Sequence, residues 1–293
     1  MSRPVRILAF GDNVVDCYRD QNIMFPGGNC VNHAVFARRA GAETAYAGAV
    51  CDDVAGRLIR QALVEEGVDV SLLRIEPGPT AYCVIETQAG ERTFVGANLG
   101  VSIIAPLPAD LARLGDFDAV HTGRSSHVDD WLPAFRQATR VSYDLATVHD
   151  PDRIARVAPN CFLLAFSASG LSDTQALALA ERARAGGSEW SLVTRGGEGA
   201  LLLGPDGAYR APIHPVEAVD TLGAGDTFIA NTLVGLLRGT PPQAVLQDAA
   251  QAAARTCLER GAFGHGALLE VDFSTMMSLE EIYSETRALA TGR

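Results

Sequence analysis

The chain has 293 residues, of which 47% are hydrophobic, 20% charged and 6% aromatic, a composition typical of globular enzymes and foreign to disordered or collagen-like chains. Thirty-five acidic residues against 24 basic ones give a net charge of −11, which disfavours a broad nucleic-acid or anionic-membrane surface. All 24 basic residues are arginine, so P-loop, protein-kinase and Schiff-base or pyridoxal chemistries, which need a lysine, are excluded.

The cysteine and hydropathy patterns indicate the cellular compartment of the protein. Six scattered cysteines, without a CxxC pair or histidines at zinc spacing, indicate buried reduced thiols rather than a metal cage or disulfide framework. No apolar stretch approaches the ~18 residues of a membrane span. We therefore expect a cytoplasmic protein with neither a membrane nor nucleic acid as a partner.

The N-terminal part of the chain alternates predicted strands and helices. Apolar runs and helix-ending glycines predict a strand, helix, strand, helix and extended segment in turn, at 5–10, 31–41, 42–50, 53–67 and 68–75. Asp53 is the expected cap of the second helix, and Gly41 and Gly67 follow the two helices. Because helices separate the strands, we expect a parallel sheet.

A hairpin then interrupts this alternation. Two polar-alternating segments joined by a turn-like QAGE predict a β-hairpin over 80–98. Further strand candidates follow at 117–123, 140–146, 160–167, 190–196 and 200–211. The sequence thus predicts one α/β domain over 1–293, a doubly wound and mostly parallel sheet with helices on both faces, to which the 80–98 hairpin adds a small β lid.

Two more helices are expected near the C-terminus. The segment 240–262 has prolines where a first helical turn tolerates them and a glycine just past its end. In the tail, Ser278 and Glu281 have the spacing of a capping box, which predicts a final helix within 275–293.

The most informative segment is VDTLGAGDTFIANTLVGLLRG, where a strand-like end meets a Gly-Ala-Gly turn and then an apolar helix. Converging backbone amides at the start of that helix would form an anion site, with Asp226 in its first turn. A carboxylate beside a phosphate pocket suggests a base that deprotonates an attacking hydroxyl. The alternative is that Asp226 only caps the helix. A dinucleotide fingerprint is excluded because Phe228 occupies the place of its third glycine.

A second segment, FPGGNCVNHAVFARRAG, places glycines before the first helix and follows GDNVVD at the end of the first strand. Ligands of open α/β sheets bind at the carboxyl ends of strands, where carboxylates and amides suit sugar hydroxyls. The candidates for such contacts are Asp12, Asp16, Asn29 and Asn32. Each has a structural alternative, a turn for Asp12 and a helix cap for Asn32.

Together the two segments resemble the PfkB/ribokinase family of carbohydrate kinases, through PGGNCVNHA and DTLGAGDTF, and the resemblance extends to about Gly266. It implies a ribokinase-like fold, ATP with Mg²⁺, and a sugar acceptor. A monovalent cation and a homodimer are options that it leaves open. By that likeness the catalytic set is Asp226 with the backbone of Gly223, Ala224 and Gly225; the substrate set is Asp12, Asp16, Gly28 and Asn32; and the nucleotide set is Thr194, Gly196 and Gly199.

Departures from the family pattern refine this expectation. The family's Asn-x-x-Glu motif, associated with magnesium, is missing near LLAFSASG, so the metal ligands are left unassigned. Three features are most similar to the fructoselysine 6-kinase branch: the GDNVVD opening, the short segment 16–27 and the ending RGAF. The segment 16–27 is shorter than in ribokinase, which indicates a reduced lid. After the strand candidate 117–123, His121, Arg124, Ser126 and His127 are expected to rim the substrate site.

The resemblance therefore implies transfer of the γ-phosphoryl group of ATP to the C6 hydroxyl of a fructosamine such as fructoselysine, with Arg124 on the carboxylate of the amino-acid substituent. The alternatives within the family are a fructokinase, a 2-keto-3-deoxygluconate kinase or a nucleoside kinase. An alternative of another class is a catalytically silent regulator that binds sugar or nucleotide.

Overall fold

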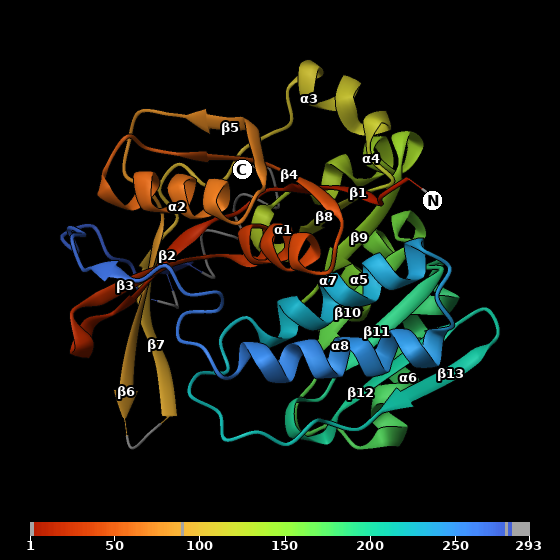
Figure 1. The fold of residues 1–293 in the computed structure, drawn as a ribbon. Coiled ribbons are helices and arrows are strands. Elements are labelled where there is room, and N and C mark those ends of the chain that lie inside the picture. The colour runs from red at the N-terminus through yellow and green to blue at the C-terminus, as the bar shows by residue number, and fades with distance from the viewer. Residues whose placement is uncertain (1–2, 89–90, 279–280, 283–293) are drawn as a thin grey trace.

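The computed structural model describes residues 3–88, 91–278 and 281–282 and shows a large α/β layer with a second, smaller sheet beside it (Figure 1). The large sheet has nine strands in the order β13-β12-β11-β10-β9-β8-β1-β4-β5. Its strands are β1 (Arg6–Phe10), β4 (Glu43–Val50), β5 (Asp69–Ile75), β8 (Ala119–Gly123), β9 (Arg140–Asp144), β10 (Leu163–Ser167), β11 (Trp190–Thr194), β12 (Ala200–Gly204) and β13 (Gly207–Ala211). From β5 to β11 neighbouring strands are parallel, while β12 and β13 are antiparallel.

Helices cover both faces of this sheet, and each face has its own apolar core (Figure 1). One face carries α1 (Asn29–Arg39), α2 (Val54–Glu65), α7 (Ala224–Leu237) and α8 (Pro242–Thr256). The other carries α3 (Pro108–Arg113), α4 (Leu132–Ala138), α5 (Pro151–Val157) and α6 (Asp173–Ala185). Short 3₁₀ turns are η1 (Arg19–Gln21), η2 (Leu114–Asp116), η3 (Arg124–Ser126), η4 (Asp129–Trp131), η5 (Ala158–Asn160) and η6 (Gly196–Glu198).

The smaller sheet has five strands in the order β14-β3-β2-β6-β7, and we call it the lid sheet. Its strands are β2 (Val14–Tyr18), β3 (Ile23–Gly27), β6 (Tyr82–Gln88), β7 (Glu91–Asn98) and β14 (Ala267–Leu268). The predicted 80–98 hairpin is β6 and β7. The sequence pattern did not predict β2, β3 and β14, and the expectation of a lid reduced relative to ribokinase stays a prediction.

The sheet order reverses at β1, which has β4 on one side and β8 on the other. In open α/β sheets the crevice outside the carboxyl ends of strands at such a reversal is the usual ligand site. Asp12 follows β1, Arg124 follows β8, and Asp144 is the last residue of β9. The topology thus brings two carboxylates and a guanidinium to one edge of the sheet.

Several local signals formed as the sequence predicts. Asp53 caps α2 by accepting a 2.7 Å hydrogen bond from the Gly56 amide, and Gly41 and Gly67 adopt positive φ just after α1 and α2. The strand-like approach to the Gly-Ala-Gly turn is wrong, because residues 212–223 contain no strand.

The predicted C-terminal helix falls largely outside the described residues. Its capping box does form, since the Ser278 amide donates to Glu281 Oε2 over 2.8 Å and the Glu281 amide donates to Ser278 Oγ over 3.3 Å.

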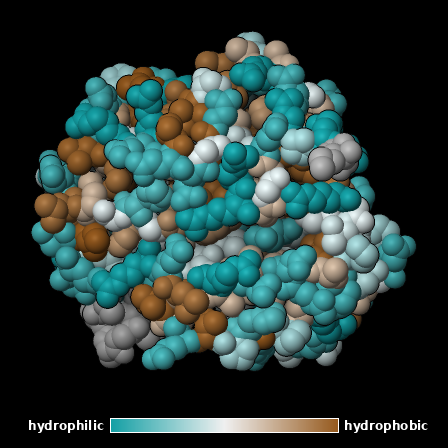
Figure 2. Space-filling view, viewed as in Figure 1, coloured by the Kyte–Doolittle hydropathy of each residue, from teal (hydrophilic) through white to brown (hydrophobic). Residues whose placement is uncertain are grey.

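In the described part of the chain, no helix is both long enough and apolar enough to span a bilayer. On the face shown in Figure 2, hydrophobic residues form separate small groups among hydrophilic ones. All six cysteines lie within the described residues and are free thiols, but the expected burial holds for three of them, Cys17, Cys30 and Cys161, while the other three are partly exposed.

Candidate active site

Asp226 lies in the first turn of α7, and its carboxylate is directed to α1. Asn32 Nδ2 donates to Asp226 Oδ2 over 2.7 Å, and Asn29 Nδ2 donates to Asp226 Oδ1 over 3.1 Å. Both oxygens are therefore engaged by a helix almost 200 positions away in the chain. This geometry does not suit a carboxylate that only caps its own helix, nor an Asn32 that only caps α1.

Asn29 is the centre of the polar cluster. Its Nδ2 also donates to Asp144 Oδ2 over 3.0 Å, and its backbone amide donates to Asp12 Oδ2 over 3.0 Å. Three carboxylates, Asp12, Asp144 and Asp226, are thus joined through one side chain and its own backbone. Because α1 begins at Asn29, the start of α1 holds the cluster together.

Asp12 is occupied by protein partners on both oxygens. Oδ2 accepts from the Asn29 amide, and Oδ1 accepts from the Ser126 hydroxyl over 2.8 Å. Ser126 in turn accepts from the Asp12 amide over 3.2 Å. Asp12 therefore satisfies an otherwise orphaned amide at the start of α1 and couples the β1 and β8 ends.

The start of α7 is built to leave backbone amides accessible. Gly223, the N-cap, has φ +76°, and a Cβ there would lie 2.7 Å from the Ala262 Cβ. Ala224 N makes only a long 3.4 Å bond to the Thr221 carbonyl. A Cβ added to Gly225 would meet no described atom within 4 Å beyond its own helix and neighbours. Such first-turn amides, at the positive end of the helix dipole, are suited to bind an anion.

Asp220 links this turn to the lid sheet. Its Oδ1 accepts from the Leu222 amide over 2.9 Å, and its Oδ2 accepts from the Gly261 amide over 3.1 Å and from the Tyr18 hydroxyl over 2.6 Å. Tyr18 ends β2 of the lid sheet. The lid sheet and the anion-binding turn are thereby fastened to one buried carboxylate.

Asp16 and Asn32 flank Gly27. A Cβ at Gly27 would lie 2.0 Å from Asp16 Oδ2 and 3.9 Å from Asn32 Oδ1, so a side chain there would displace the Asp16 carboxylate. Asn32 Oδ1 is buried and has no hydrogen-bond partner among the described residues. Gly28 has φ +100°, and a Cβ added there would lie 2.7 Å from the Asn13 Cα, so only glycine fits. The predicted substrate residues Asp16, Gly28 and Asn32 therefore lie together, with an open acceptor between α1 and the lid.

Burial of the acids sets their charge state. Loss of solvent, helped by the nearby Asp144 and Asp12 charges, raises the pKa of Asp226 to about 8 against the opposing hydrogen bonds from Asn32 and Asn29. Burial likewise raises the pKa of Asp144 to about 6, and the Arg124 charge opposes that rise. A carboxyl that titrates close to neutrality in a cleft is typical of a general base.

The residues expected to rim the site differ in position. Arg124, half-buried, is near enough to Asp144 to favour its charged form. His121 is fully buried and hydrogen-bonds Asn29 behind the cluster, so its expected place on the rim is wrong. The strand β8 alternates its side chains, and His121 faces α1 rather than solvent.

The predicted nucleotide residues form the turn between β11 and β12. Thr194 Oγ1 donates to the Phe166 carbonyl over 3.2 Å, tying the end of β11 to β10. Gly196 and Gly199 have φ +56° and +86°, and a Cβ at Gly199 would lie 2.2 Å from the Ala211 carbonyl oxygen. These glycines are required by the turn itself, whatever the turn binds.

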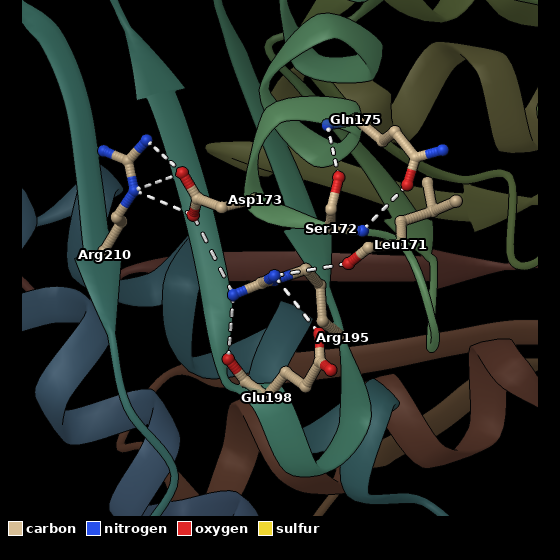
Figure 3. A network of polar contacts seen from close by, with 7 residues as sticks. All are labelled: Leu171, Ser172, Asp173, Gln175, Arg195, Glu198 and Arg210. Carbon is tan, nitrogen blue, oxygen red and sulfur yellow. Dashed lines mark hydrogen bonds and ion pairs between the residues drawn. The ribbon is translucent and has the colours of Figure 1, made fainter.

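Arg195, between these residues, anchors the turn to its surroundings (Figure 3). Its Nη1 donates to the Leu171 carbonyl and to Glu198 Oε2, both over 3.2 Å, and its Nη2 donates to the Glu198 carbonyl over 3.0 Å. Asp173, at the start of α6, lies 3.8 Å from Arg195 Nη2 and pairs with Arg210 of β13 over 2.8 Å. The turn is thus held between α6 and the sheet edge.

Sequence reasoning missed Asp144. It belongs to no motif, and its only sequence signal is a carboxylate at the carboxyl end of a buried strand, the position that the fold turns toward ligands. Across residues 3–88, 91–278 and 281–282, no group of three or more His, Cys, Asp or Glu side chains is arranged to hold a metal ion.

Comparison with known proteins bears on this geometry. A model of the pfkB family of carbohydrate kinases matches residues 7–264. A fructosamine kinase of Bacillus subtilis (strain 168) is 36% identical over 267 residues, covering 89% of this chain and 94% of its own length. A fructoselysine 6-kinase of Escherichia coli (strain K12) is 34% identical over 262 residues, covering 88% and 99%.

Solved structures share the fold. Arabidopsis thaliana ribokinase, complexed with ribose and ATP, has a TM-score of 0.76 at 22% identity, covering 89% of this chain and 94% of its own. Fructokinase of Xylella fastidiosa, with bound ATP, has a TM-score of 0.74 at 18% identity, covering 98% of each chain. The predicted ribokinase-like α/β class is therefore confirmed.

Proposed function

Since the chain belongs to the pfkB family of carbohydrate kinases, as its motifs predict, we propose that it transfers the γ-phosphoryl group of ATP to the C6 hydroxyl of a fructosamine such as fructoselysine. Membership of the family makes the chain a phosphotransferase with an alcohol group as acceptor. The finer choice of acceptor is supported by the two relatives named for fructosamine and fructoselysine, each of which matches the chain over nearly nine-tenths of its length.

The observation that carries the mechanism is the partly buried Asp226 beside the open first turn of α7. The Asp226 carboxylate accepts the proton of the C6 hydroxyl while that oxygen attacks the γ-phosphorus. The new O6–P bond forms as the bond to the β-phosphate oxygen breaks, and ADP leaves. The backbone amides of Gly223, Ala224 and Gly225 stabilise the charge on the transferring group.

The sugar hydroxyls are assigned to the residues around Gly27. The orphaned Asn32 Oδ1 is an acceptor without a donor in the described structure, and a sugar hydroxyl supplies one. Asp16, 4% exposed, offers a charged acceptor on the lid side of the same place. Together they would orient the acceptor so that its C6 oxygen faces Asp226.

The nucleotide is assigned to the turn that contains Thr194, Gly196 and Gly199, at the same sheet edge as the carboxyl end of β9. Both structural neighbours described above are complexes with ATP. For Mg²⁺, the described side chains provide no three-ligand cage, which fits an ion carried by the phosphate oxygens and water rather than by the protein.

Arg124 is assigned to the amino-acid substituent of the fructosamine. It follows β8 beside the catalytic cluster and already acts on Asp144, so a carboxylate of the substrate would find a cation there. Contacts to this remote group would help position the reacting hydroxyl, which should raise kcat as well as lower KM.

The test is kcat/KM across fructoselysine, other fructosamines, fructose, ribose, 2-keto-3-deoxygluconate and adenosine with magnesium-ATP. We expect a fructosamine to lead, with the Arg124→Met variant losing most of that preference and little activity on fructose. If fructose or a nucleoside leads by tenfold or more, about 1.4 kcal/mol of transition-state preference, the acceptor assignment is wrong while the kinase class stands. If ATP consumption is absent with every acceptor, the catalytically silent alternative is favoured.

A further inference from the structure

His121 occupies a fully buried position between β9 and the start of α1. Its Nδ1 is 3.0 Å from Ser142 Oγ, and its Nε2 is 3.2 Å from Asn29 Oδ1. Its ring stacks on that of His33, with centroids 3.5 Å apart and planes 6° from parallel. These contacts form a series of hydrogen bonds from Ser142 through His121 to Asn29. The series ends at the carboxylates of Asp226 and Asp144.

The direction of each hydrogen bond in this chain can be derived. The Asn29 side-chain amide faces two carboxyl groups, and when both are ionised only its Nδ2 can satisfy them, so in that state its Oδ1 accepts. Burial lowers the pKa of His121 to about 3, so the ring is neutral and carries one N–H. That N–H is on Nε2 and donates to Asn29 Oδ1, and the Ser142 hydroxyl donates to Nδ1.

We propose that His121 is a positioning residue that keeps the Asn29 amide group pointed at the catalytic base, and thereby sets the pH range in which Asp226 is charged. The proposal rests on the proposed function for its kinetic consequence, although the orientation of Asn29 stands on the geometry alone. If the Asn29 amide were turned by half a rotation, its oxygen would face both carboxylates, and both would lose a donor.

The other groups facing Asp226 do not depend on His121. Asn32 donates from the next turn of α1, and the charges of Asp144 from β9 and Asp12 from the end of β1 disfavour the ionised base. Arg124 acts on Asp144 from η3. Two hydrogen bonds, from Asn29 and from Asn32, stabilise the charged form of Asp226. In the described structure, only the Asn29 amide is held in its orientation by a second partner, His121.

The test compares His121→Leu with His121→Gln and with His33→Leu. The introduced leucine side chain cannot donate, whereas the introduced glutamine amide nitrogen reaches the place of Nε2. His33 is the matched control because it is buried in the same stack, yet neither of its ring nitrogens has a hydrogen-bond partner in the described structure. The readouts are the pH profile of kcat/KM and the NMR titration of ¹³C-labelled aspartate carboxyls, with the Asp226 signal identified from Asp226→Asn.

In His121→Leu, we expect the pKa of Asp226 to rise by about one pH unit from its value of about 8, and kcat/KM at pH 7 to fall about tenfold, because one donor to the charged form is lost. His121→Gln should restore most of the wild-type pKa. His33→Leu should lower the melting temperature and leave that pKa unchanged.

A folded His121→Leu with the wild-type pKa of Asp226 would overturn the proposal, and so would an equal rise in His33→Leu. Should His121→Leu fail to fold, His121→Phe keeps a ring of similar size that cannot donate to Asn29 Oδ1, and the pKa of Asp226 should rise; no rise would count against the proposal. The NMR titration needs no turnover. It therefore tests this inference even if no fructosamine is phosphorylated, which would refute only the proposed function.

Discussion

Replacing Asp226 with asparagine should separate the chemistry of this site from its architecture. The new amide keeps the shape and can keep both hydrogen bonds: its oxygen accepts from Asn29, and its nitrogen donates to Asn32, whose Oδ1 is unpartnered in the described structure and can turn to accept. What is lost is the ability to take a proton. We therefore expect kcat to fall by ~10²–10⁴ with the KM for ATP little changed, while the KM for the sugar rises where the turned Asn32 amide no longer offers its oxygen.

The same substitution should stabilise the fold. Because the pKa of Asp226 is about 8 in the folded chain against an ordinary value of 3.8, the unfolded chain releases this proton first, and folding weakens as pH rises between those values. At about 1.4 kcal/mol per pH unit, the wild type should lose about 3 to 4 kcal/mol of its free energy of unfolding through Asp226 between pH 5 and pH 8. The stability advantage of Asp226→Asn over the wild type should grow by the same amount over that range.

The assays are steady-state kinetics, calorimetric ATP binding, and urea denaturation at pH 5 and pH 8. Asn231→Ala is the control on the same helix, since the Asn231 side chain donates only to the Thr227 carbonyl of α7, and it should keep its activity. An Asp226→Asn variant that binds ATP and turns over near the wild-type rate would refute the assignment of the base. A stability difference that does not grow with pH would refute the account of its burial.

Three further outcomes follow from the site. Since Asp226 must be ionised to accept a proton and its pKa is about 8, kcat/KM should rise about tenfold per pH unit below pH 7 and level off above pH 8, whereas a flat profile from pH 6 to 9 would contradict the raised pKa. Asp16→Ala should lower kcat/KM for the sugar at least about tenfold and leave calorimetric ATP binding without sugar nearly intact. Gly225→Val has open space for its side chain and should fold, but it should weaken ATP binding far more than sugar use; matching losses of both ligands in both variants would indicate misfolding instead.

The main sheet was predictable because its strands are short apolar runs, which are local signals. The lid strands β2 and β3 were not predictable from the same signals. Asp16 interrupts the apolar run of β2, and a strand with a buried charge in its centre is stabilised by its neighbours β3 and β6 rather than by its own pattern.

Some residues of the candidate site were likewise predictable from the sequence and others were not. Asp226 and Asn32 lie in two motifs whose chemistry can be reasoned from residue types, and the structure joins them by a hydrogen bond. Asp144 and His121 carry no such signal, since a strand pattern gives alternation of faces but not which face meets a helix. Their places follow only from strand order, which sets β8 beside β1 and β9 beside β8, so that both residues reach the start of α1.

The reach of Asn29 has a consequence for how activity arises during synthesis. Its partners Asp12, Asp144 and Asp226 come from the beginning, middle and late part of the chain, the last of them 197 positions away. A chain emerging from the N-terminus contains all nine strands of the large sheet before α7 exists, although the lid sheet still lacks β14. The proposed base arrives only when that helix docks on α1, so under the proposed mechanism no shorter intermediate can transfer a phosphoryl group.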